Sequence, residues 1–196
     1  MKQPDKSNGY ERIAPIFISG RGQNHTGVGA RVVAEWSQLL PDGATVLDLG
    51  CGPGVPISET LIHKGFRVYG IDASPTMVAA FQANFPGTPV QCAAVEDSDF
   101  FNRSFDAVLA WGLLFLLDSE TQRRVIAKAA AVLPSGGRML FTAPREVCSW
   151  LDAMTEERSM SLGFDEYRNA LEIDGMQLVG TQTDEGGSYY YSAMRP

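Results

Sequence analysis

One stretch constrains the fold of this chain more than any other: an apolar run that breaks into a loop with three glycines. The run spans Val46–Leu49, and Gly50, Gly52 and Gly54 stand at alternate positions behind it. Glycine lets the backbone turn sharply and approach a ligand without a Cβ in the way. A second apolar run ends at Asp72, 22 residues after Gly50, close to the ~20 expected in a nucleoside-binding β-α-β unit. The pattern therefore predicts an adenosine-like cofactor.

Other residues of the loop argue against a phosphate ligand. A dinucleotide-binding loop needs a glycine where Val55 stands, and the Gly-Lys-Ser/Thr run of a P-loop is missing. Pro53 has no backbone N–H to offer a phosphate, and Asp48 adds a negative charge that suits a cationic ligand. We therefore interpret the loop as a cradle for a nucleoside that carries an amino acid.

Short apolar runs alternate with helical stretches, which predicts an α/β fold with a mostly parallel sheet covered on both faces. We expect strands at 45–49, 67–71, 89–93, 105–110 and 137–142, a final antiparallel hairpin of 177–183 and 188–194, and helices at 55–64, 75–84 and 120–132. In such a sheet a ligand lies outside the carboxyl ends of the parallel strands. The loops behind these strands should therefore form the site.

The first part of the chain has a different pattern. The apolar run Ile13–Ile18 and the glycine-rich run Gly20–Gly27 predict a flexible lid before Asn24, and we expect an amphipathic helix from about Val28 to Leu40.

The composition fits one acidic globular domain. At 196 residues the chain suits a single domain, since domains typically span ~50–250 residues. A net charge of −7 without a basic stripe argues against a nucleic-acid partner and favours a small molecule. No apolar run approaches the ~18 residues of a membrane span, and no signal peptide is visible. Three cysteines without metal-ligand spacing predict free thiols, a cytoplasmic location and no bound metal.

Several motifs of the chain resemble those of one enzyme family, the class I S-adenosylmethionine (SAM)-dependent methyltransferases of the small-molecule type (methyltransferase type 11/12-like). The matching stretches are Val46–Gly54 (first motif), Tyr69–Ser74 (second motif), Ser104–Trp111 (fourth strand), Leu133–Arg138 (turn into the fifth strand) and Leu171–Gly175 (last helix and turn). The resemblance implies a methyl-transferring enzyme with SAM as cofactor and a small-molecule acceptor. It also implies a Rossmann-like seven-stranded sheet of order 3-2-1-4-5-7-6 with strand 7 antiparallel.

The resemblance also divides the single domain into two expected parts. Residues 1–43 should form an N-terminal helical lid and a helix that fold over the cofactor and part of the acceptor, and residues 44–196 the methyltransferase domain. We also consider a homodimer as the assembly of the protein.

The expected cofactor contacts follow the motifs. Asp72 should accept both ribose hydroxyls, and Asp48 should fix the loop and meet the ligand's ammonium group through water. We expect Gly50, Cys51 and Gly52 along the methionine moiety, and Ala73 and Met77 beside the adenosine. Val95 or Glu96 should contact the adenine, with Asp97 as a further alternative. Trp111, after the fourth strand, should also contact the cofactor.

Methyl transfer from a sulfonium needs alignment and desolvation first, and a base only when the acceptor must lose a proton. No catalytic triad is visible, and the histidine that many relatives carry near Phe115 is missing. The catalytic candidates are His25 in the lid and Tyr189 in the last hairpin. The expected acceptor-binding residues are Arg21, Arg145, Trp150, Asp184 and Glu185. The two arginines hint at an anionic acceptor, although each could equally lie on the surface.

Three other functions compete with this hypothesis. A non-catalytic SAM sensor or partner subunit would share every cofactor residue. A macromolecule-directed methyltransferase is disfavoured because Ala110-Trp111-Gly112 stands where DNA-directed enzymes carry Asn/Asp-Pro-Pro. A nicotinamide-binding module is disfavoured by Val55 and Pro53.

Overall fold

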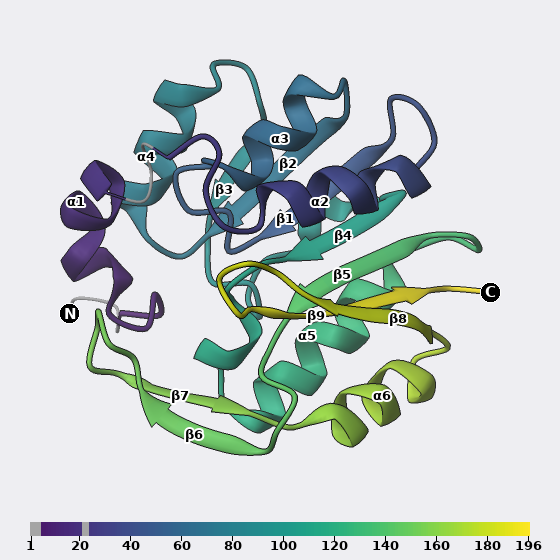
Figure 1. Cartoon of the computed structure of the whole chain (residues 1–196). Coiled ribbons are helices and arrows are strands. Elements are labelled where there is room, and N and C mark those ends of the chain that lie inside the picture. The colour runs from purple at the N-terminus through teal and green to yellow at the C-terminus, as the bar shows by residue number, and fades with distance from the viewer. Residues whose placement is uncertain (1–4, 21–23) are drawn as a thin grey trace.

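The computed structural model describes residues 5–20 and 24–196, and in Figure 1 a central twisted sheet separates two layers of helices. The strands of this sheet are β1 (Thr45–Leu49), β2 (Arg67–Asp72), β3 (Val90–Cys92), β4 (Ala107–Ala110), β5 (Arg138–Thr142), β8 (Gln177–Thr183) and β9 (Tyr189–Met194). Their order is β3-β2-β1-β4-β5-β9-β8, with β9 antiparallel to both β5 and β8. Since β8 and β9 are the sixth and seventh strands of this sheet along the chain, the expected order 3-2-1-4-5-7-6 is confirmed.

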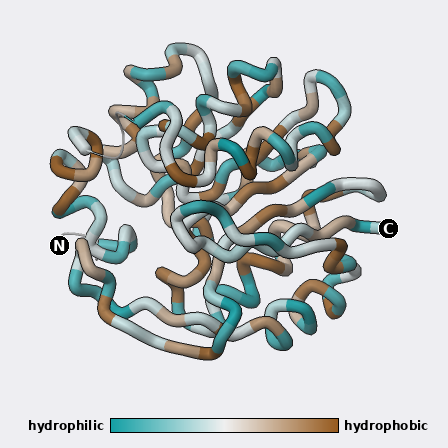
Figure 2. Tube along the Cα trace, in the orientation of Figure 1, coloured by the Kyte–Doolittle hydropathy of each residue, from teal (hydrophilic) through white to brown (hydrophobic). Residues whose placement is uncertain are grey.

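The apolar runs form the central strands because both of their faces are covered. All residues of β1 are buried, and consecutive side chains enter opposite cores, as the two-residue period of a strand requires. Leu47 packs in the core beneath α5 (Ser119–Ala131) and α6 (Phe164–Ile173). Val46 packs beneath α2 (Ala30–Trp36) and α3 (Ile57–His63). Figure 2 shows hydrophobic residues along the central strands and hydrophilic ones on the outer turns of the helices.

Several expected boundaries agree with the structure. The helix α4 (Pro75–Asn84) and the strand β8 have the predicted ends. The expected helix from Val28 to Leu40 is shorter: Gly29, with a left-handed φ of 94°, precedes α2, and the chain continues after Trp36 as the 3₁₀ turn η2 (Ser37–Leu39). Among the described residues, two further 3₁₀ turns are η3 (Phe100–Asn102) and η4 (Leu114–Leu116).

Two elements differ from the expectation. The apolar run Ile13–Ile18, expected in a flexible helical lid without assigned helix bounds, lies inside the helix α1 (Tyr10–Gly20). The segment after β5 forms a separate two-stranded hairpin, β6 (Cys148–Leu151) and β7 (Arg158–Ser161), which the sequence patterns did not predict. In Figure 1 the tip of this hairpin lies near the start of α1, so the two additions meet beside the carboxyl ends of the sheet strands.

Candidate functional site

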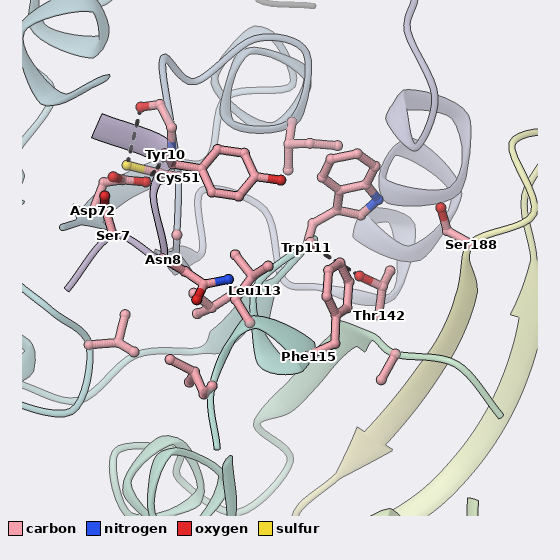
Figure 3. A pocket seen from close by; sticks show the side chains of 18 of the residues that line it. Ser7, Asn8, Tyr10, Cys51, Asp72, Trp111, Leu113, Phe115, Thr142 and Ser188 are labelled. Atoms are coloured by element: carbon pink, nitrogen blue, oxygen red, sulfur yellow. Dashed lines mark hydrogen bonds between the residues drawn. The ribbon is translucent and has the colours of Figure 1, made fainter. Parts of the chain in front are cut away.

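A cavity of about 690 Å³ opens at the carboxyl ends of β1, β2, β4 and β5, where ligands of open α/β sheets bind. Its volume lies within the ~300–1,000 Å³ typical of small-molecule sites. The loops behind these strands form its floor, and the N-terminal segment 6–17, β6 and the β8–β9 turn supply its walls. Figure 3 shows Asp72 and Cys51 at one end, Trp111 and Phe115 at the other, and the Tyr10 ring pointing from the first toward the second. We call these the cofactor end and the acceptor end.

The glycine loop follows β1 in a conformation that side chains disfavour. Gly50, Gly52 and Gly54 all have positive φ angles, of 70°, 53° and 83°. A Cβ on Gly54 would lie 2.5 Å from Phe85, whereas a Cβ on Gly52 would meet nothing within 4 Å. The loop is therefore packed on its inner side and open on the side of the cavity, as a backbone cradle for a ligand requires.

Asp72 ends β2 and ties the two cofactor loops together. Its Oδ2 accepts a hydrogen bond from Gly52 N at 2.9 Å, and its Oδ1 accepts one from Ser74 N at 2.8 Å. Burial raises the pKa of this carboxyl, and the two backbone N–H groups oppose that shift. The side-chain cap of α4 is Ser74, which accepts from Met77 N at 3.1 Å. Asp72 thus faces the cavity with a fixed orientation and is not the helix cap.

Asp48 lies beneath the same loop and is 1% exposed. Its Oδ2 accepts a hydrogen bond from Ser58 Oγ at 2.5 Å. Burial raises the pKa of Asp48 to about 7, assisted by the nearby charge of Asp72 and opposed by the Ser58 hydrogen bond. Burial likewise raises the pKa of the Cys51 thiol well above its ordinary value, so this cysteine is a protonated lining group. A cationic ligand at this position would favour the ionised form of Asp48.

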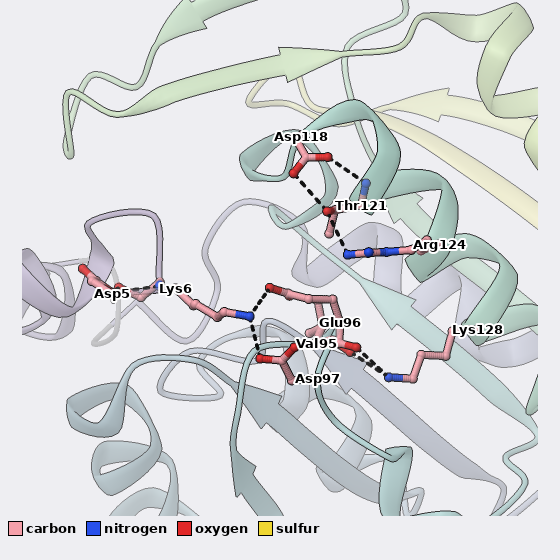
Figure 4. Close-up of polar contacts among 10 residues, drawn as sticks. Asp5, Lys6, Val95, Glu96, Asp97, Asp118, Thr121, Arg124 and Lys128 are labelled. Atoms are coloured by element: carbon pink, nitrogen blue, oxygen red, sulfur yellow. Dashed lines mark hydrogen bonds and ion pairs between the residues drawn. The ribbon is translucent and has the colours of Figure 1, made fainter. Parts of the chain in front are cut away.

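The loop after β3 is held from two directions (Figure 4). From α5, Lys128 Nζ donates to the carbonyl oxygens of Val95 and Glu96, each at 3.2 Å, and to that of Ser98. From the N-terminal segment, Lys6 Nζ pairs with Glu96 Oε1 at 3.2 Å and with Asp97 Oδ2 at 2.6 Å. The second carboxylate oxygen of Glu96, Oε2, is buried and has no hydrogen-bond partner among the described residues. It is available to an N–H donor of a ligand, since buried polar atoms are nearly always paired.

The N-terminal segment is joined to the rest of the site by side-chain bonds on both sides. Glu11 accepts from Thr76 N at 3.1 Å and Thr76 Oγ1 at 2.7 Å at the start of α4, and also from the Ser74 hydroxyl. Arg12 donates to the carbonyl of Thr155 in the β6–β7 turn. The segment is therefore an ordered bridge between α4 and the hairpin, with Lys6 pairing it to the β3 loop as well.

Asn8 stands just before α1 and has a left-handed φ of 51°, which is uncommon for a residue other than glycine. Its side chain lines the cavity, and its Nδ2 is buried without a hydrogen-bond partner among the described residues. A buried amide nitrogen without a protein partner can donate a hydrogen bond to an oxygen of a bound molecule.

At the acceptor end, Trp111 is fixed by a buried relay of polar groups. Its Nε1 donates to the Tyr190 hydroxyl at 2.6 Å, which in turn donates to Asp184 Oδ2 at 2.8 Å. Asp184 Oδ1 accepts from the N–H groups of Gly186 and Ser188, both at 2.9 Å. Burial raises the pKa of Tyr190, and its hydrogen bond to Asp184 adds to that shift. The relay connects the end of β4 to the β8–β9 turn.

Three of the residues expected near the acceptor do not line the cavity, and a fourth is not among the described residues. Asp184 does not line the cavity, because its carboxylate organises the β8–β9 turn. Glu185 is exposed and lies 3.5 Å from Arg31, away from the cavity. His25 is also absent from the lining; its exposed ring contacts Glu59 at 2.7 Å, as in an ordinary surface ion pair. Arg21 lies outside the described residues.

The other expected residues line the cavity, apart from the alternative Asp97, whose exposed carboxylate pairs with Lys6. Those at the cofactor end are Asp48, Gly50, Cys51, Gly52, Asp72, Ala73, Met77, Val95 and Glu96, and those at the acceptor end are Trp111, Arg145, Trp150 and Tyr189. Sequence reasoning did not assign a role to Asn8, Glu11, Lys128 or Tyr190. Glu11 and Lys128 act through contacts to segments more than thirty positions away, and Tyr190 reaches Trp111 across 79 positions. None of these contacts has a local spacing that could have revealed it.

Two further features of the described residues bear on the class of site. No group of three or more histidine, cysteine or acidic side chains that could hold a metal ion occurs there. None of the helices in this part of the chain has both the length and the apolar character needed to cross a membrane.

Comparison with known proteins shows which family the chain resembles. A family described as "Methyltransferase domain" matches residues 46–137. The aklanonic acid methyltransferase of Streptomyces sp. (strain C5) is 29% identical over 147 residues, covering 70% of this chain and 61% of that protein. A ubiquinone biosynthesis O-methyltransferase of Idiomarina loihiensis is 37% identical over 116 residues, covering 56% of this chain and 46% of that protein. The chain thus spans about half to three fifths of the length of these curated relatives.

A solved structure shares the same fold. An amino pentose methyltransferase from Micromonospora echinaspora, determined with SAM bound, superposes with a TM-score of 0.73 at 21% identity, covering 94% of this chain and 97% of that one. The matched domain contains the glycine loop, Asp72 and Trp111. In the sequence of residues 46–137 and in its fold, the chain is thus similar to the class I SAM-dependent methyltransferases.

Proposed function

We propose that this protein transfers the methyl group of SAM to a small-molecule acceptor. The observation that carries the proposal is one continuous cavity with two different ends. Its cofactor end has the open glycine cradle and Asp72, and its acceptor end lies beyond them between the β4, β5 and β6 segments. A sensor that only bound SAM would not need this second compartment, so the catalytic function is favoured over the sensor.

The residues of the cofactor end fit SAM. The open side of Gly52 leaves room for the methionine part, and the buried, unpaired Glu96 Oε2 offers an acceptor for the adenine amino group. Asp72 would accept the ribose hydroxyl hydrogens. Asp48, with a pKa of about 7, would lose its proton when the cationic ligand arrives. Val95 and Met77 supply apolar lining beside the adenosine.

When bound, SAM supplies an electrophilic methyl group, whose transfer to a nucleophilic atom leaves a neutral thioether and releases any proton that the atom carried. The protein's part is to align the two molecules and to exclude water. The Trp111 wall, fixed by Tyr190, limits where the acceptor lies, and the N-terminal segment covers the cavity from the other side. Tyr189 lines the cavity, and we regard its hydroxyl as a candidate group near the acceptor.

A small acceptor is favoured over a nucleic acid by the net charge of −7, since nucleic-acid binders usually show a basic surface. Cytoplasmic location and homodimer formation stay predictions, to be checked by fractionation and by light scattering.

The proposal is tested by titrating the full chain with S-adenosylhomocysteine (SAH) and with NAD in a calorimeter. SAH should bind and NAD should not. Asp72→Ala should weaken SAH binding about tenfold to a hundredfold, since a charge-assisted contact contributes ~1.5–3 kcal/mol. The matched control is Asp106→Ala, which removes a carboxylate that accepts two hydrogen bonds from Thr45, each at 2.7 Å, at the opposite end of the sheet. It should lower stability and leave SAH affinity unchanged. Binding of NAD alone would refute the proposal, and SAH production from SAM with a panel of acceptors would separate the enzyme from the sensor.

A further inference from the structure

The acceptor end of the cavity has a chemical character of its own. We propose that it receives an uncharged, flat aromatic molecule that carries a hydroxyl or carbonyl oxygen. This inference rests on the proposed function, because it names the class of acceptor for the same site.

Two pairs of aromatic side chains from different parts of the fold form the walls. Phe115 in η4 and Trp150 in β6 lie with ring centroids 5.6 Å apart at an interplanar angle of 43°. Tyr10 and Phe17 in α1 form an edge-to-face pair with centroids 5.7 Å apart. All four line the cavity and are only partly buried, so ring surface is left for a ligand. Aromatic faces and edges favour another flat ring in stacked or edge-on contact.

The charged groups at this end are exposed to solvent. Arg145 and Glu146 line the cavity, yet both side chains are exposed. The Arg145 guanidinium carbon lies 5.8 Å from the centroid of the Phe164 ring, which is not part of this cavity's lining. Transfer of an ionised ligand group into an apolar compartment without a charged partner is costly. We therefore expect the compartment to disfavour anions and cations, whereas Arg145 in the sequence had pointed to an anionic acceptor.

The polar groups that do face this compartment are neutral. Asn8 lies beside Leu113, between the two ends of the cavity (Figure 3), and its Nδ2 is buried without a partner among the described residues. Ser188 lies beyond Trp111, on the opposite side of the cavity. A hydroxyl or carbonyl oxygen on the ring could accept from the Asn8 amide. A hydroxyl could also donate to the Ser188 oxygen. Neutral groups of this kind orient a ligand without requiring charge.

The test compares three probes that share one ring system and differ only in charge. The full chain, saturated with SAH, is titrated calorimetrically at pH 7 with 2-naphthol, 2-naphthoate and 2-naphthylmethylammonium. We expect a dissociation constant at least tenfold lower for neutral 2-naphthol than for either ion. Equal or tighter binding of an ion, or no binding of 2-naphthol at millimolar concentration, would overturn the inference. Failure of SAH itself to bind would refute the proposed function instead, so the two outcomes are distinguishable.

Substitutions of the aromatic wall residues test whether 2-naphthol binds in this compartment. Phe115→Ala and Trp150→Ala should each weaken 2-naphthol binding about tenfold and leave SAH affinity within twofold. The matched control is Phe66→Ala, a half-buried phenylalanine before β2, at the opposite end of the sheet, which should change neither. If the alanine variants melt too low to titrate, Phe115→Leu and Trp150→Phe give smaller losses in the same direction. Wild-type binding of 2-naphthol by both wall variants would show that the aromatic walls do not hold the acceptor.

Asn8 provides a separate readout for the oxygen of the ligand. The wild-type protein should bind 2-naphthol several-fold more tightly than naphthalene, which lacks the oxygen. Asn8→Leu should abolish this difference while SAH affinity stays unchanged. An unaltered preference in Asn8→Leu would remove Asn8 from the acceptor contacts and contradict that part of the inference.

Discussion

Tyr190→Phe should be more damaging than the loss of a single oxygen atom suggests. The side chain is fully buried, and its hydroxyl is the only link between Trp111 Nε1 and Asp184 Oδ2 in the described hydrogen bonds. Phenylalanine would fit the same space and remove the hydroxyl that contacts both Trp111 Nε1 and Asp184 Oδ2. The loss of a buried hydrogen-bond partner costs ~1–3 kcal/mol. Asp184 keeps the two backbone N–H groups that donate to its Oδ1, which limits the free-energy cost at this carboxylate.

We therefore expect the free energy of unfolding to fall by about 3 kcal/mol. For a chain of this size that corresponds to a drop of about 6 to 12 °C in Tm. The measurement is urea unfolding together with a thermal melt of the full chain. The neighbour Tyr191 offers a close control, since it is equally buried but its hydroxyl makes one long contact of 3.4 Å, to Pro144 O. Tyr191→Phe should cost less than about 1 kcal/mol.

A second measurement separates the relay from general packing. The indole N–H resonance of Trp111, assigned with Trp111→Phe, should shift and exchange faster with solvent in Tyr190→Phe, while those of Trp36 and Trp150 stay in place. Asp184→Asn combined with Tyr190→Phe should cost less than the sum of the two single changes, because both act on one network. If Tyr190→Phe is as stable as Tyr191→Phe, or if the Trp111 resonance does not move, the relay does not hold the Trp111 wall.

Three further predictions concern the cofactor end. Because burial raises the pKa of Asp48 to about 7, the folded state keeps a proton that the unfolded state has lost, so the free energy of unfolding should fall as pH rises from about 4 to 7. Asp48→Asn should remove this fall and stabilise the ligand-free protein at pH 8 by up to about 4 kcal/mol in urea titrations. Lys128→Met should weaken SAH binding in calorimetry about tenfold, since the loop at Val95 loses its donor, whereas the exposed Lys64→Met should not. Glu11→Ala should speed hydrogen exchange in α1, and Glu35→Ala, an exposed change in α2, should leave it unchanged.

The cofactor end could be predicted from the sequence because its determinants are local. Asp72 and the glycine loop belong to one β-α-β unit, whose short connections fix how far apart the two strand ends lie. Parallel pairing then aligns Leu49 with Ile71, so the residues that follow them face one cavity. The sequence separation between the glycine loop and Asp72 is therefore a direct consequence of the sheet geometry.

The acceptor end could not be predicted in this way because long-range packing determines it. His25 had the right chemistry and a suggestive place in the chain, but Glu59 on α3 pairs with it outside the cavity. Pro15 disfavours a helix in the apolar run, since it lacks the N–H that would bond to the carbonyl of Glu11. The helix α1 forms regardless, with Ala14 buried and Glu11 bonded to α4. Tertiary contacts compensate there for a poor local propensity.

The bonds of Glu11 have a consequence for how the cavity closes. Ser74 donates its hydroxyl to Glu11 and its backbone N–H to Asp72, and its oxygen also caps α4 through Met77 N. The residue that orients the Asp72 carboxylate, which we propose binds the ribose, is therefore the same one that holds the N-terminal segment. Opening of that segment would remove one of the bonds that fix Ser74, and a ligand held by Asp72 would favour the arrangement in which all of them are made. Cofactor binding and closure over the acceptor are thus expected to stabilise each other, with Ser74 as the shared contact.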